Sequence, residues 1–136
     1  MLPGRSYITA HDVAVHVITA GLCALGLIKG DPTEAVEQGS YKRFFPAKTS
    51  HWLGLDVHDV GDYRVDGESR LLEPGMVLTV EPGIYIAPDD LTVPEAWRGI
   101  GIRIEDDVAV LRDGNEVLTA GVPKDPREIE ALLGAR

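Results

Sequence analysis

Three residues in the middle of the chain have side chains that could hold a metal ion: His51, Glu81 and Glu105. Histidine offers an imidazole nitrogen and glutamate a hard oxygen, a mixture that suits Mn²⁺, Fe²⁺, Co²⁺ or Zn²⁺. The three residues are far apart in the sequence, so only a folded sheet can bring them together. Taken singly, a carboxylate on a strand usually faces solvent and a histidine beside a tryptophan usually packs at the surface. Spacing alone leaves both interpretations open.

The segment that carries these residues is rich in β-prone sequence. Five such runs follow one another: Val77–Glu81, Ile84–Ile86, Gly101–Glu105, Asp107–Leu111 and Glu116–Thr119. Gly101–Glu105 alternates apolar and charged residues, which is typical of a strand with two different faces. The turn residues Asp113-Gly114-Asn115 predict a hairpin between the last two runs. Short strands and loops are expected between Arg43 and Asp59.

A helix is predicted from Thr9 to Leu25, with Thr9 as its N-cap. One apolar stripe marks the face that should be buried, since its members recur at helical spacing: Ala14, Ile18, Leu22 and Leu25. Gly26 and Gly30 end the pattern.

Two further helices are indicated by their first residues. Asp31–Glu37 has Pro32 at the first helical position, and a C-terminal helix starts at Pro126. Asp125 is its expected N-cap, and Glu128 completes a capping box. The length of the chain predicts a single domain, residues 1–136.

Composition excludes several classes of function. The chain has 136 residues, of which 44% are hydrophobic, and a formal net charge of −9. This acidic balance argues against binding to nucleic acid, which needs a basic surface. The single cysteine, Cys23, excludes an intrachain disulfide and a cysteine-based zinc site. The longest apolar stretch, Val13–Ile28, contains polar residues, so neither a membrane span nor a signal peptide is visible, and the cytoplasm is the expected location.

Three motifs occur in a specific order: SHWLGLDVHDVG at Ser50–Gly61, LEPGMVLTVEPGIY at Leu72–Tyr85 and GIGIRIEDDV at Gly99–Val108. Together they resemble the metal-binding segments of aminopeptidase P, the Xaa-Pro aminopeptidase, and the resemblance extends over essentially the whole chain. Prolidase, methionine aminopeptidase and creatinase share its fold, but Ser50–Gly61 points to the Xaa-Pro branch. The resemblance implies an α+β architecture, the pita-bread fold, in which helices cover a curved, mostly antiparallel sheet.

The resemblance also implies roles for individual residues. His51, Glu81 and Glu105 match three of the five ligands of a pair of metal ions, which lower the pKa of a bound water molecule. Glu81 would also relay a proton to the leaving proline nitrogen. His58 would stabilise the tetrahedral intermediate, and Arg103 would orient the carboxylates.

Two departures from the family pattern limit this expectation. The other two family ligands are aspartates on strands before the first helix, and no matching strand motif occurs in this sequence. The chain is therefore expected to be a truncated, roughly half pita-bread domain, without the N-terminal domain and without the first half that carries those aspartates. Ala47-Lys48 also replace the usual His-Gly pair. Lys48 either shields the acidic pocket or points to solvent, and the sequence leaves both possibilities open.

These observations predict a divalent metal, with Mn²⁺ expected, Zn²⁺ or Co²⁺ as alternatives, and at most one weakly bound ion. The substrates of an active chain would be Xaa-Pro peptides, with weak or absent hydrolysis by this chain alone. A homodimer is expected to cover the exposed side of the sheet. The alternatives are a non-catalytic binding or dimerisation module, or a remnant without a selected role.

Overall fold

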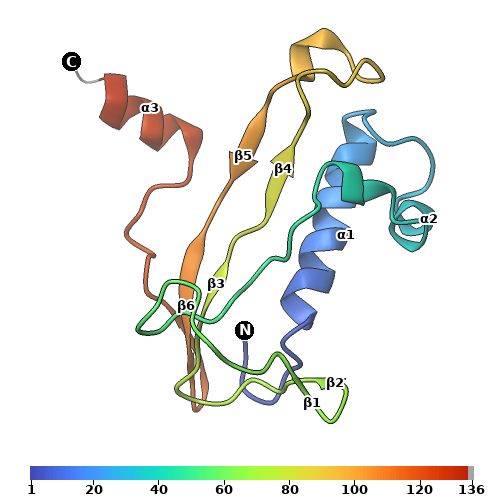
Figure 1. The fold of residues 1–136 in the computed structure, drawn as a ribbon. Helices are drawn as coiled ribbons and strands as arrows, with labels where there is room; N and C mark the ends of the chain where they lie inside the picture. Colours follow the sequence, from blue (N-terminus) through green and yellow to red (C-terminus); the bar gives the residue numbers. More distant parts are fainter. Residues whose placement is uncertain (135–136) are drawn as a thin grey trace.

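Helices and antiparallel strands make up residues 1–134, the part of the chain that this computed structural model describes (Figure 1). The helices are α1 (Thr9–Ala24), α2 (Pro32–Glu37) and α3 (Pro126–Gly134), with 3₁₀ turns η1 (Ser40–Arg43) and η2 (Glu95–Trp97). The strands are β1 (Arg64–Val65), β2 (Glu68–Ser69), β3 (Val77–Val80), β4 (Gly83–Tyr85), β5 (Gly101–Arg103), β6 (Asp106–Leu111) and β7 (Gly114–Val117). The pairs β1–β2, β3–β6, β6–β7 and β4–β5 are all antiparallel. The predicted α+β architecture is confirmed.

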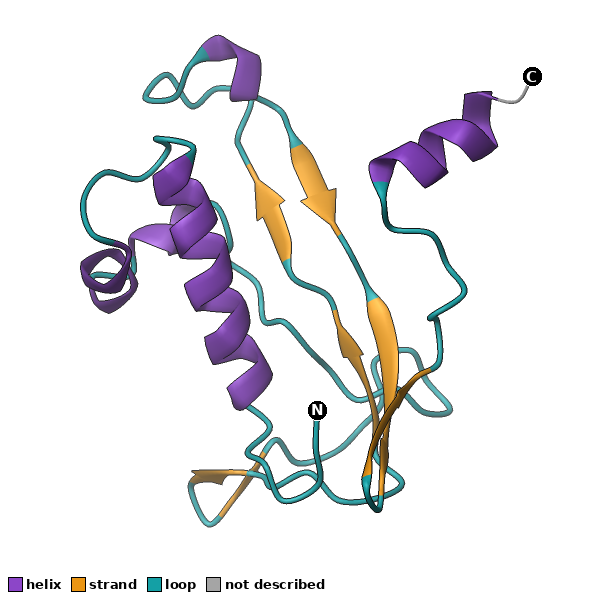
Figure 2. Ribbon diagram, turned by 180° about the vertical axis from the view of Figure 1, so that it is seen from behind, coloured by secondary structure: helices purple, strands orange, loops and turns teal. Residues whose placement is uncertain are grey.

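The β3–β6 and β4–β5 pairs together form one long two-stranded ribbon that is interrupted in the middle (Figure 2). β3 pairs with β6 up to Val80 and Asp106, and β4 pairs with β5 from Gly83 and Arg103 onward. Pro82 lies between the two ladders and has no backbone N–H to donate, so a regular ladder cannot continue through it. The Ile104 N–H donates to the Pro82 carbonyl oxygen at 3.3 Å and keeps the strands side by side across this gap.

The predicted hairpin is present, but its turn lies earlier than expected. Leu111 pairs with Gly114, so Arg112 and Asp113 form the two-residue connection and Gly114 already belongs to β7. The ladder extends through Gly114 and Asn115, which the sequence assigned to the turn. Cross-strand pairing thus continues into residues whose type favours a turn.

The extent of α1 agrees with the prediction, but the predicted N-cap is wrong. Ile8 is the N-cap residue and makes no side-chain capping bond, and Thr9 is the first helical residue. The start of the helix is fixed by distant contacts instead: the Tyr7 N–H donates to the Arg70 carbonyl oxygen at 2.8 Å, and the Ile8 N–H donates to Ser69 Oγ at 3.2 Å. Tertiary hydrogen bonds here replace a local cap.

The buried face of α1 is also rotated from the predicted stripe. Val15, Thr19 and Leu22 are buried, whereas Leu25 is 52% exposed. Thr19 tolerates burial because its hydroxyl donates to the Val15 carbonyl oxygen at 2.6 Å. Leu22 confirms one member of the predicted stripe, whereas Thr19 was missed because the prediction counted only apolar residues.

The other two helices begin as predicted. The Asp31 side chain accepts hydrogen bonds from the backbone N–H groups of Thr33 and Glu34, with Pro32 first in α2. The Asp125 carboxylate accepts one from the Arg127 N–H at 2.8 Å at the start of α3. No residue of α3 is buried within residues 1–134, and Figure 1 shows α3 well apart from α1. None of the helices in the described residues combines the length and apolar character that a bilayer crossing requires.

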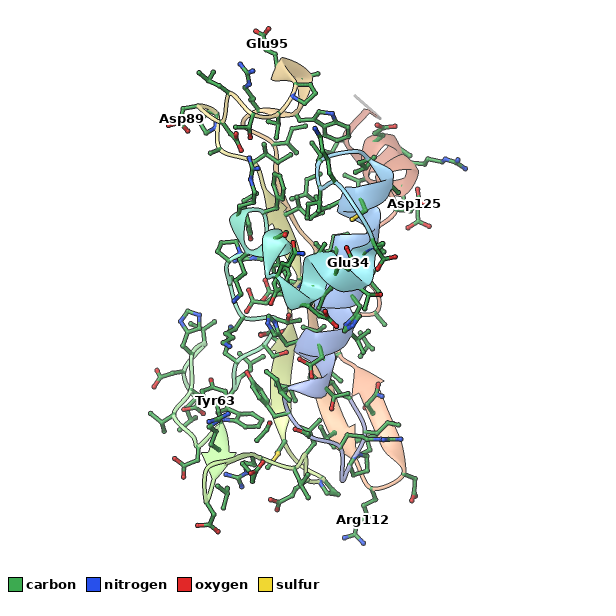
Figure 3. All side chains as sticks on the ribbon, turned by 90° about the vertical axis from the view of Figure 1, so that its right-hand side faces the viewer. Glu34, Tyr63, Asp89, Glu95, Arg112 and Asp125 are labelled. Atoms are coloured by element: carbon green, nitrogen blue, oxygen red, sulfur yellow. The ribbon has the colours of Figure 1, made fainter. Side chains whose placement is uncertain are left out.

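Two apolar clusters hold these elements together. One joins α1 and α2 to the ends of the β4–β5 ribbon and contains Leu22, Ile28, Ala35, Phe44, Ile86 and Val93. The other contains Trp52, Leu72, Leu78 and Val110 and lies beneath β3 and β6. Tyr63, which lies at the lower left of Figure 3, stacks on Trp52 with ring centroids 5.4 Å apart.

The loop after Trp52 folds tightly around Asp59. Its N–H donates to the Trp52 carbonyl oxygen, and its carboxylate accepts from the N–H groups of Leu55 and Val60. A Cβ atom at Gly61 would lie only 2.6 Å from Cδ1 of the buried Trp52 ring. Glycine is therefore required where this loop passes the second cluster.

We expect Gly61→Ala to lower the free energy of unfolding by about 1–3 kcal/mol, because the added methyl group overpacks against the indole. Denaturant unfolding of the variant and the wild type measures this change. Gly121→Ala is the matched control, since a Cβ atom there meets nothing within 4 Å. Equal losses in both variants would contradict the assignment.

Candidate metal centre

His51 is positioned by hydrogen bonds between an irregular segment, residues 49–53, and β3. The Leu53 N–H donates to the Val77 carbonyl oxygen, the Thr79 N–H to that of His51, and the Glu81 N–H to that of Thr49. These bonds, 2.7–3.0 Å long, follow an antiparallel pattern in which His51 lies opposite Thr79. The segment therefore acts as an additional, irregular strand beside β3.

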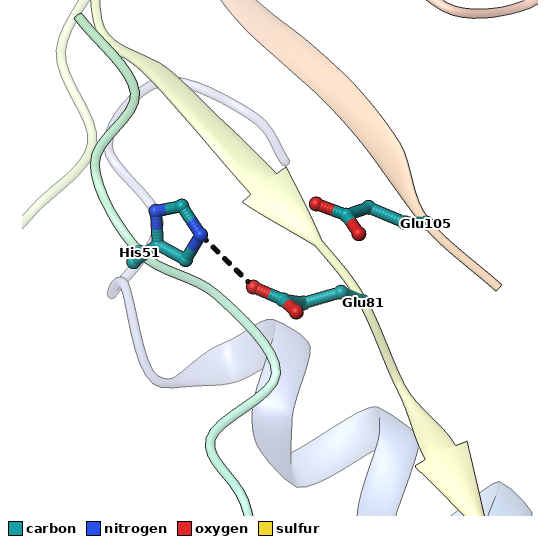
Figure 4. Close-up of side chains that lie close together, drawn as sticks. All are labelled: His51, Glu81 and Glu105. Atoms are coloured by element: carbon teal, nitrogen blue, oxygen red, sulfur yellow. Dashed lines mark ion pairs between the residues drawn. The ribbon is translucent and has the colours of Figure 1, made fainter. Parts of the chain in front are cut away.

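The two carboxylates come from the gap in the ribbon. Glu81 follows β3 directly, and Glu105 precedes β6 on the neighbouring strand. One ligand atom from each of His51, Glu81 and Glu105 lies within 4.8 Å of the others (Figure 4). The structure thus brings together the three residues that the sequence singled out. Their role as ligands stays a prediction.

The donor set fits a divalent cation. His51 Nδ1 lies 2.9 Å from the Trp52 carbonyl oxygen, and because a carbonyl can only accept, Nδ1 carries the proton. Nε2 is then unprotonated in the neutral ring and faces Glu81 Oε1 at 3.1 Å. One imidazole nitrogen and two carboxylates, with a second polar group fixing the ring, is the arrangement that metal-binding histidines use. The side chains of His51 and Glu81 are only 17% and 13% exposed.

Arg103 lies between the two carboxylates. Its Nη1 is 3.4 Å from Glu81 Oε2, and its Nε is 3.8 Å from Glu105 Oε2. A cation in this position offsets the repulsion of two nearby negative charges. The alternation in Gly101–Arg103 explains the placement, since Arg103 faces the site and Ile102 faces the opposite side.

His58 lies beside His51 at the edge of the site. The two ring centroids are 4.3 Å apart with an interplanar angle of 73°. The tightly folded loop described above carries His58 and brings it back over the segment of His51. Both rings line a cavity of about 600 Å³.

Thr79 is a site residue that the sequence reasoning missed. Its buried hydroxyl donates to Glu81 Oε1 at 3.0 Å and accepts from the His51 N–H at 3.1 Å. The signal was available, because residues two apart on a strand share one face.

Tyr7 was also missed, and no local pattern indicates it. Its hydroxyl donates to the Ser50 carbonyl oxygen, from the turn before α1. Burial raises the pKa of the Tyr7 phenol above its ordinary value, with smaller contributions from Tyr63 and Glu81, so the group stays a neutral donor. It anchors the segment that carries His51 from the other side.

The sequence left open whether Lys48 shields the acidic pocket or points to solvent. Its side chain lines the cavity that His51, His58 and Glu81 also line, although the residue as a whole is exposed. Burial lowers the pKa of the nearby His11 imidazole, and the charge of Lys48 lowers it further. Lys48 makes no ion pair with Glu81, whose carboxylate pairs with His51 and Arg103.

We expect Thr79→Val to weaken both the fold and the site. The substitution keeps the shape of the side chain but leaves the buried His51 N–H without an acceptor, at a cost of about 1–3 kcal/mol in unfolding free energy. Loss of this orienting bond should weaken Mn²⁺ binding by about 10- to 100-fold. Thr79→Ser retains the hydroxyl and is the control. Equal Mn²⁺ affinities for the two variants, measured calorimetrically, would disprove the orienting role.

Comparison with known proteins places these features in a family. The sequence profile of Metallopeptidase family M24 matches residues 1–112. The Xaa-Pro aminopeptidases of Escherichia coli and Haemophilus influenzae are 57% and 50% identical to the chain over 133 residues. Each match covers 98% of this chain but only 30% of the relative.

Solved structures agree with the sequence comparison. The aminopeptidase PepP of Pseudomonas aeruginosa superposes with a TM-score of 0.96 and 61% identity, over 99% of this chain and 30% of that protein. A zinc-substituted E. coli aminopeptidase P in complex with product superposes with a TM-score of 0.91 and 57% identity, over 98% of this chain and 30% of that one. The predicted fold is confirmed as a part of the pita-bread domain. The chain belongs to metallopeptidase family M24 and is similar to its Xaa-Pro aminopeptidases.

Proposed function

We propose that this chain provides part of the catalytic centre of a metal-dependent peptidase. The peptidase would remove the N-terminal residue of a peptide by hydrolysing the bond between that residue and a following proline. The observation that carries the proposal is the convergence of His51, Glu81 and Glu105 within 4.8 Å in a member of a metallopeptidase family. The substrate class rests on the relatives, which are Xaa-Pro aminopeptidases. The cytoplasmic location that the sequence suggests stays a prediction.

The three residues would hold one divalent ion, with Mn²⁺ as the expected metal and Zn²⁺ or Co²⁺ as alternatives. When bound, such an ion polarises a carbonyl and makes a water molecule acidic enough to attack it near neutral pH. Binding should be weak because three donors leave several coordination positions open and because Arg103 competes for both carboxylates.

Side chains of the chain supply the other steps. Glu81 is held by the Thr79 hydroxyl at one oxygen and faces Arg103 at the other, so it is oriented to pass a proton to the leaving proline nitrogen. His58, at the edge of the same cavity, would donate a hydrogen bond to the carbonyl oxygen as negative charge develops there. Arg103 would orient both carboxylates. By itself, the chain is expected to hydrolyse Xaa-Pro peptides weakly or not at all.

Calorimetric titration of metal-stripped protein with Mn²⁺ tests the centre. We expect saturable binding of about one ion per chain, and loss of that binding in the double variant Glu81→Gln/Glu105→Gln, which removes two charged ligands. Glu116→Gln, a carboxylate on β7, is the matched control. Absence of saturable binding to folded wild-type protein would overturn the proposal. Hydrolysis of alanyl-proline in the same samples measures the residual activity.

A second function, a dimerisation module, is favoured by an uncovered apolar face. Two adjoining grooves of about 620 and 330 Å³ run between α1 and the strands, and both are lined by Ile18 and Pro82. Their walls carry apolar side chains that are exposed in the chain alone, such as Val17 at 67% and Ile102 at 60%. Continuous exposed apolar surface of this kind usually marks an interface. We propose a second copy of the chain as its occupant, in a two-fold homodimer.

Light scattering coupled to size-exclusion chromatography tests the homodimer. We expect a dimer at micromolar concentration, and a monomer for Val17→Glu/Ile102→Glu, because charges on the face oppose burial. Leu55→Glu is the control, since Leu55 is fully exposed but lies on the Asp59 loop, outside the grooves. A monomeric wild-type chain would refute the homodimer and leave the metal centre unaffected.

A further inference from the structure

The cavity beside the candidate metal centre has an unexpected charge. Among its lining residues are two permanent cations, Lys48 and Arg64, and one carboxylate, Glu81. Glu81 already pairs with Arg103. Neither Lys48 nor Arg64 has an ion-pair partner within residues 1–134. A protein of net charge −9 thus places two uncompensated positive charges in one cavity.

A buried polar group in the same cavity also lacks a partner. Ser50, which lines the wall next to His51, is 8% exposed, and its hydroxyl oxygen is fully buried without a hydrogen-bond partner in the described residues. Buried hydroxyls are nearly always hydrogen-bonded. An unpartnered Ser50 hydroxyl in the wall of a cavity that also contains two unpaired cations therefore points to a ligand that accepts hydrogen bonds. An oxyanion meets this requirement.

We propose that Lys48 and Arg64, with the Ser50 hydroxyl, form a subsite for the carboxylate of a peptide. This inference rests on the proposed peptidase function, because the subsite is useful to a peptide whose scissile bond lies at Glu81. Guanidinium and ammonium groups bind carboxylates through charge-assisted hydrogen bonds. The carboxylate has two sources: the C-terminus of a short peptide such as a dipeptide, or an acidic side chain that follows the proline in a longer one.

The subsite gives a function to the departure at Ala47-Lys48. Lys48, the second residue of this departure, brings a long cationic side chain to the cavity wall. Arg64 reaches the cavity from β1, on the hairpin that Tyr63 introduces. Two cations from distant segments therefore converge on one volume, and neither is needed to hold the fold through an ion pair.

Equilibrium binding of small peptides to the whole chain tests the subsite. Alanyl-proline and its C-terminal amide are titrated into metal-free protein and again with Mn²⁺, so that the readout does not depend on hydrolysis. We expect the free acid to bind about 10-fold more tightly than the amide, as charge-assisted hydrogen bonds predict. The preference should fall to near 1-fold in Lys48→Gln/Arg64→Gln, and Lys48→Arg should retain it. Arg112→Gln, an exposed cation at the β6–β7 turn, is the control.

Two tripeptide amides with glutamate or glutamine after the proline identify the source of the carboxylate. Tighter binding of the glutamate peptide supports a side-chain carboxylate, and a preference confined to the free dipeptide acid supports the C-terminus. Equal binding within both pairs by wild-type protein (acid and amide, glutamate and glutamine peptide), no binding of any peptide, or a preference that survives the double variant would overturn the subsite. The Mn²⁺ titration is independent of these results, so failure of the subsite and failure of the metal centre are distinguishable.

Discussion

The hydrogen bonds between residues 49–53 and β3 determine where His51 lies relative to Glu81. His51 belongs to no regular strand, and its ring reaches Glu81 only because Thr79 and Glu81 bond to its segment. A shift of one residue in this pairing would turn His51 to the opposite face of the sheet. Trp52 and Leu78 form a bridge at the same place and bury it in the second apolar cluster, so packing and hydrogen bonding fix the same register.

Pro82 makes the other essential contribution, because it opens the sheet where the carboxylates stand. Glu81 and Glu105 lie at this gap and are directly opposite each other in the register that the flanking pairs Val80–Asp106 and Gly83–Arg103 define. Arg103 then offsets the charge that these two carboxylates concentrate.

Local signals in the sequence predicted what depends on local chemistry. The Pro-Gly pairs and the alternation of Gly101–Glu105 indicate strands, and Asp31 and Asp125 cap helices as their residue type suggests. The start of α1 was assigned wrongly because distant residues, Ser69 and Arg70, fix it. The motifs identified His51, Glu81 and Glu105, but the direction of Lys48 and the anchor provided by Tyr7 depend on how separate segments pack, which no short pattern encodes.

The ladder pairs of β3–β6 and β4–β5 stop on either side of Pro82, and the hydrogen bond from the Ile104 N–H to the Pro82 carbonyl oxygen links them across the gap. Glu81, directly after β3, and Glu105, directly before β6, lie on the two neighbouring strands at this gap. A metal ion that binds both carboxylates would therefore link the two strands at the gap, and its binding free energy would add to the stability of the folded chain. By thermodynamic linkage, the stability of the paired strands in turn affects the affinity for that metal ion.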